Sequence, residues 1–75
     1  MDIETRLRKL ESRYRAALSS AVAAKAHYLA LAGEASATPA AVERAKAYWQ
    51  QLESRKKAIA ERMNEVEQLE HDETA

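Results

Sequence analysis

The chain has 75 residues, and its twelve basic and twelve acidic side chains give a formal net charge of zero. A domain this short seldom gains more than a few kcal/mol from a single core without disulfides, metal or oligomerisation. Because it contains no cysteine, disulfides, thiolate metal sites and thiol redox chemistry are excluded. Charged residues make up 32% of the chain, which has one glycine, one proline and no phenylalanine. That composition is typical of long helices.

The first segment, MDIETRLRKLE, is charged and amphipathic, which argues against a secretory signal. The most apolar stretch, residues 16–31, is interrupted by serine, lysine and histidine, and it falls short of the ~20 apolar residues of a membrane span. We therefore expect a cytoplasmic protein that does not associate with membranes.

A first helix is predicted at about residues 2–32. Its apolar positions alternate spacings of three and four, which is the repeat of a coiled-coil seam. The seam consists of Ile3, Leu7, Leu10, Tyr14, Ala17, Ala21, Ala24, Tyr28 and Leu31. Alanine occupies three successive seam positions in its middle, where a helix normally carries large core side chains.

A break follows at about residues 33–38. Gly33 can adopt the left-handed conformation that ends a helix, and Thr38 before Pro39 is typical of an N-cap followed by proline at the first helical position. These signals predict a short connection between two helices rather than one continuous rod.

A second helix is predicted at about residues 39–69, followed by a frayed tail at 70–75. Its seam repeats the same spacing through Val42, Ala45, Trp49, Leu52, Lys56, Ile59, Met63 and Val66. The fold class is therefore all-α: a single domain, 1–75, formed by an antiparallel, coiled-coil-like helical hairpin. The alternative is a straight intermolecular coil in which both seams face other chains.

Folding the chain back at the break places large seam residues against small ones. Trp49 then faces Ala24, Leu52 faces Ala21, and Tyr28 faces the small side chain at position 45. Such matching is what close packing requires. At a further layer, Lys56 lies opposite an alanine, so its stem can pack while its ammonium reaches solvent.

Apolar residues also lie off the seam. Leu18, Val22 and Leu29 lie to one side of the first helix with Ala26 nearby, and Tyr48 lies on the other side near the break with His27. Unpaired apolar surface of this kind indicates a partner. We expect a homodimer that forms a four-helix bundle, or a partner helix from another protein, with these residues at the interface.

The charges flanking the seam are segregated. A basic edge carries Arg6, Arg13, Arg55 and Arg62. An acidic edge carries Glu4, Glu11, Glu53 and Glu67, diluted by Lys25 and Lys46. Like charges should meet across the hairpin, which is mildly unfavourable. An intermolecular contact between a basic and an acidic edge would relieve both edges, whereas the alternative is that these long side chains are solvated and screened. Pairs four residues apart, such as Glu4 with Arg8 and Glu53 with Lys57, are also expected.

Few residues are suited to chemistry. His27 has no carboxylate one turn away. His71 follows Glu67 by four residues, a spacing that can bridge a divalent ion, but His71 lies in the predicted tail. No nucleophile with a base or glycine-rich phosphate loop is present. The sequence argues against an enzyme and predicts no cofactor, metal site or small-molecule substrate.

The first hypothesis for function is a non-enzymatic protein–protein interaction module. The alternatives are a nucleic-acid-binding hairpin that uses the basic edge and a small co-chaperone for a helical client. In topology and size the chain resembles helical-hairpin proteins that form four-helix bundles, such as the plasmid repressor-of-primer RNA-binding proteins, and the two-helix co-chaperones of type III secretion. No motif of either family matches, so the resemblance assigns no functional residues.

Overall fold

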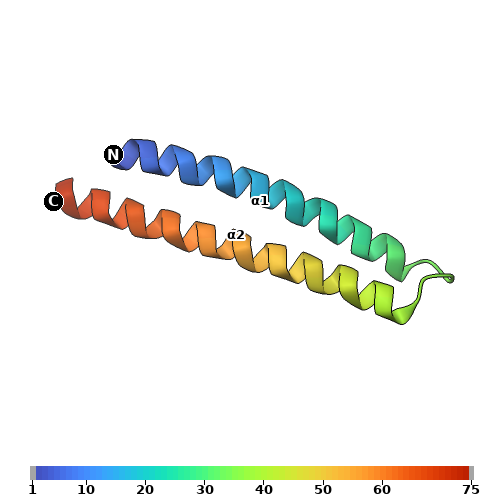
Figure 1. Ribbon diagram of the computed structural model, residues 1–75. Helices are drawn as coiled ribbons and strands as arrows, with labels where there is room; N and C mark the ends of the chain where they lie inside the picture. Colours follow the sequence, from blue (N-terminus) through green and yellow to red (C-terminus); the bar gives the residue numbers. More distant parts are fainter. Residues whose placement is uncertain (1, 75) are drawn as a thin grey trace.

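The computed structural model describes residues 2–74, apart from the side chains at positions 70, 73 and 74. Two helices make up the fold, α1 at Ile3–Ala32 and α2 at Pro39–Thr74. They run antiparallel and form a rod measuring 58 × 15 × 15 Å, with both ends of the chain at one end of the rod and the bend at the other (Figure 1). The predicted all-helical hairpin is confirmed.

The start of α1 is fixed by an N-cap. The backbone N–H of Thr5 donates to a carboxylate oxygen of Asp2 at 2.7 Å, and the N–H of Arg6 donates to the Asp2 carbonyl at 3.2 Å. These bonds satisfy amide groups that the first turn of a helix otherwise leaves unpaired. The bond from the Thr5 N–H lowers the pKa of Asp2, because it stabilises the charged carboxylate.

The bend differs from the sequence prediction at Gly33. This residue has φ −86° and ψ −7°, in the right-handed region, rather than the expected left-handed conformation. Its N–H donates to the carbonyls of Leu29 and Ala30, and the next N–H, of Glu34, donates to Leu31. The chain thus leaves α1 by tightening its last turn with i to i+3 bonds, so no left-handed residue is required.

The start of α2 follows the prediction. The hydroxyl oxygen of Thr38 accepts a bond from the Ala41 N–H at 3.2 Å, and its carbonyl accepts one from the Val42 N–H at 3.1 Å. α2 continues to Thr74, beyond the predicted end at about residue 69. No glycine or proline follows Pro39, so nothing in the sequence stops the helix there. The last position of the predicted tail, Ala75, lies outside the described residues.

The two predicted seams form the interface between the helices. Every seam residue named in each helix is buried or partly buried. The buried core consists of Ala17, Ala21, Ala24, Ala45, Leu52 and Val66. Ala21, the most enclosed of these, is 0% exposed. Among the described residues no large side chain is fully buried, so the core is thin and depends on the close approach that alanine allows.

The large-against-small matching is visible around Trp49. Its indole packs on a buried cluster formed by Ala21, Ala24 and Leu52. Tyr28 stacks on the indole, with ring centroids 5.7 Å apart and planes 11° from parallel. Aromatic side chains from both helices therefore close the core on the bend side of the alanine segment.

Candidate interaction surfaces

The middle of the hairpin holds a polar cluster around the same indole. The Trp49 Nε1–H donates to one oxygen of Glu53 at 3.2 Å, and the Lys56 ammonium lies 2.9 Å from the other oxygen. From α1, the Lys25 ammonium lies 5.6 Å from the centroid of the indole ring, within cation–π range. The cluster ties the seam lysine to its own helix.

Electrostatics within the cluster stabilise the charged forms. The hydrogen bond from Lys56 lowers the pKa of Glu53, with the indole N–H adding to the effect, and the same bond raises the pKa of Lys56. The lysine predicted to pair with Glu53 was Lys57, but Lys56 takes that place because a spacing of three also brings the groups together on a helix. Another predicted pair, Glu4 with Arg8, forms at 3.1 Å on the open surface.

A row of apolar side chains lies away from the core on α1. Leu18, Val22 and Leu29, here called the α1 stripe, are 39%, 61% and 54% exposed. Ala26 beside them is also exposed, and Tyr48 on α2 is 56% exposed. Leu18 follows Glu11 by seven residues, so the stripe continues the acidic edge of α1 toward the bend. No helix in the part of the chain that the structure describes has the length and apolar character needed to cross a bilayer.

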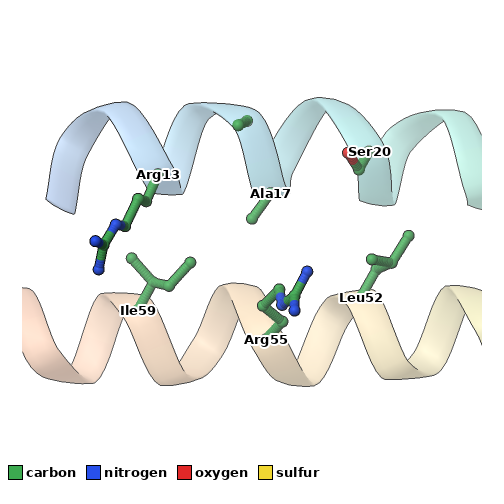
Figure 2. Close-up of a pocket in the computed structure, with 7 residues that line it drawn as sticks. Arg13, Ala17, Ser20, Leu52, Arg55 and Ile59 are labelled. Carbon is green, nitrogen blue, oxygen red and sulfur yellow. The ribbon is translucent and has the colours of Figure 1, made fainter. Parts of the chain in front are cut away.

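An open groove runs along the hairpin between the basic side chains of the two helices. Its larger part has a volume of ≈ 430 Å³ and is lined by Arg13, Ala16, Ala17, Ser20, Leu52, Arg55 and Ile59. Figure 2 shows Arg13 reaching from α1 toward α2 and Arg55 reaching from α2 toward α1, with Ala17 and Leu52 facing the space between the helices. A smaller part, of ≈ 220 Å³, continues toward the chain termini and is lined by Arg6, Lys9, Leu10, Arg13, Arg62 and Val66.

This surface, here called the arginine groove, brings together all four residues of the predicted basic edge and adds Lys9. No carboxylate lines either part of it. Arg62 lies 3.5 Å from Glu65 in an ion pair on the exposed rim. The apolar floor was not foreseen from the sequence. The sequence pattern that indicates this floor is the pair of small residues Ala16 and Ser20, which follow Arg13 at helical spacing and leave room beside it.

Comparison of the chain with protein-family models, curated proteins and solved structures gives no significant match. Function is therefore argued from the surfaces themselves. Two of them stand out: the α1 stripe, which is apolar and lies on the acidic edge, and the arginine groove, which is apolar at its floor and cationic at its walls.

Proposed function

We propose that this protein is a non-enzymatic interaction module that self-associates through the α1 stripe. The observation that carries the proposal is the exposure of Val22 and Leu29, at 61% and 54%, in a chain whose core is built largely of alanine. Large apolar side chains left in water favour association, because covering them removes apolar surface from solvent. A helix of another protein is the other candidate occupant of the stripe.

Each contact in such an assembly brings two hairpins, four helices in all, side by side. Helical bundles of this kind bury the second apolar face that a lone hairpin leaves exposed. Pairing also supplies stability that a thin core lacks, since small domains commonly depend on oligomerisation. The proposal places the module in the cytoplasm and gives it no catalytic step.

The test is sedimentation equilibrium of the pure protein at micromolar concentration. The wild type is expected to sediment above monomer mass, and a Val22→Glu, Leu29→Glu double variant is expected to be a helical monomer. The matched control is Ala47→Glu with Ser54→Glu, which adds the same charge at two exposed positions of α2 away from the seam and should leave association unchanged. A wild type that is a well-folded monomer would contradict the proposal.

A further inference from the structure

We propose that the arginine groove of one copy receives the α1 stripe and adjoining acidic edge of a second copy, oriented in the same direction. This inference rests on the proposed self-association and names the surface that the stripe meets. Stripe and groove lie on different sides of the hairpin, so the contact is head to tail rather than between two identical patches.

The groove favours an occupant that carries negative charge. Its walls carry Arg6, Lys9, Arg13, Arg55 and Arg62, with no carboxylate among the lining residues. Arg13 and Arg62 come from different helices and line the same stretch, so the hairpin itself leaves like charges facing one another. An acidic surface entering the groove would relieve that repulsion, which is the complementarity that fixes register at interfaces.

The acidic edge of the same chain matches these charges in spacing. Glu4 and Glu11 lie seven residues apart, as do Arg6 and Arg13, and each glutamate precedes its arginine by two residues. Two residues of helix correspond to ~3 Å along the axis. A parallel neighbour with no axial shift therefore sets each carboxylate level with a guanidinium. Glu4 also pairs with Arg8 of its own helix at 3.1 Å, but both side chains are exposed and such a pair contributes little, so Glu4 can turn to the neighbour.

The apolar groups match in the same register. Leu18 of an unshifted neighbour is level with Ala16, Ala17 and Ser20, the small residues that form the α1 side of the larger part of the groove. The space of ≈ 430 Å³ accommodates a leucine side chain between Arg13 and Arg55. One alignment thus satisfies both the charged and the apolar contacts.

The opposite orientation does not bring the carboxylates and the guanidinium groups together. An antiparallel neighbour with Leu18 on the same floor would carry Glu4 and Glu11 toward the bend. None of the cations that line the groove lies on that side of Arg55. The apolar floor also favours a protein over a nucleic acid, because a phosphate backbone brings charge without an apolar group to cover Leu52 and Ile59.

The experiment uses two variants that each disable one side of the contact. The groove variant carries Arg13→Glu and Arg55→Glu, and the stripe variant carries Leu18→Glu and Val22→Glu. All four positions are exposed, and circular dichroism checks that each variant remains helical. A neutral groove variant, Arg13→Gln with Arg55→Gln, tests the same contact without adding negative charge.

Each variant alone is expected to be monomeric by sedimentation equilibrium, and an equimolar mixture is expected to form a one-to-one dimer and nothing larger. In that dimer the intact stripe of the groove variant occupies the intact groove of the stripe variant. The neutral groove variant should self-associate at least about tenfold more weakly than the wild type. Mixing the groove variant with the Ala47→Glu, Ser54→Glu control should produce larger species, because the control keeps both surfaces.

Three outcomes would overturn the inference. If the groove variants self-associate like the wild type while the stripe variant does not, the stripe pairs with another stripe, and the proposed function stands without this contact. If the mixture stays monomeric, the two surfaces are not partners. If a labelled random-sequence DNA duplex binds the wild type at physiological salt and not the groove variant, while both self-associate equally, the groove belongs to nucleic acid.

Discussion

The middle of the rod and its end at the chain termini use the same seam spacing but differ in the sizes of the side chains that face each other. Near the middle, the α1 seam carries alanine at positions 17, 21 and 24, and the large Trp49 and Leu52 of α2 pack against this segment. Toward the chain termini both helices carry large seam residues, such as Leu10 and Met63, and of these terminal seam residues only Val66 is buried.

The difference teaches where binding surface comes from in a thin hairpin. Small residues against large ones bring the helices close together around Trp49, and neither part of the arginine groove extends to Trp49 or Ala24. Where large residues face each other and arginines flank them, apolar surface stays open at Leu10 and Ile59. The packing around Trp49 thus supplies stability, and the part of the rod from Leu52 toward the chain termini supplies a surface that a second molecule can cover.

The largest effect on stability is expected from replacing Leu52. Leu52→Ala should lower the free energy of unfolding by about 3 kcal/mol, because it leaves a cavity beside Ala21 and Ala24. Met63→Ala, at a partly buried seam position in the terminal half, should cost about 1 kcal/mol. Urea denaturation at one fixed protein concentration measures both, since association contributes to apparent stability. Equal losses in the free energy of unfolding would show that the middle of the rod is no more important for stability than its terminal part.

Replacing a buried alanine of the α1 seam with a larger residue should have the next largest effect on stability. Ala21 is 0% exposed, so Ala21→Leu forces the helices apart and should destabilise the hairpin by about 2 kcal/mol. The control, Ala23→Leu, places the same side chain two residues away at an exposed position and should change stability by less than about 0.5 kcal/mol. Thermal unfolding at low concentration compares them. A neutral result at Ala21 would show that close approach of the helices is not required.

The smallest effect concerns pH. Because hydrogen bonding lowers the pKa of Glu53, its contribution to stability is present above the ordinary pKa of 4.5 and is lost as pH falls through the lowered value. The pKa of Lys56 is raised, so its contribution is lost only as pH rises through that raised value. Glu53→Gln should therefore flatten the stability profile at both extremes.

Glu4→Gln is the matched control for this pH dependence, because the side chains of Glu4 and Arg8 are 77% and 76% exposed and such pairs contribute little. Urea midpoints measured across the pH range compare the two variants with the wild type. A profile for Glu53→Gln that follows that of Glu4→Gln would show that the middle cluster is no more sensitive to pH than the open surface.

The hairpin, both seams and the cap at Thr38 were predictable because each depends on local spacing and on residues that break or start helices. Other features depend on choices the sequence leaves open. Glu53 has lysines both three and four residues ahead, and only packing beside Trp49 selects Lys56. The floor of the arginine groove required the packing of both helices, since it joins Ala17 of one helix to Ile59 of the other.

The bend itself carries a consequence for sequence tolerance. Gly33 adopts a backbone conformation open to any residue, and an added methyl group would meet only the carbonyls of Leu29 and Ala30, at 3.7 Å, an ordinary van der Waals separation. The reversal of the chain thus does not depend on glycine; it uses turn hydrogen bonds from the Glu34 N–H to Leu31 and from the Ala37 N–H to Glu34, together with the Thr38 cap of α2. A variant lineage could lose its sole glycine and still keep the same topology.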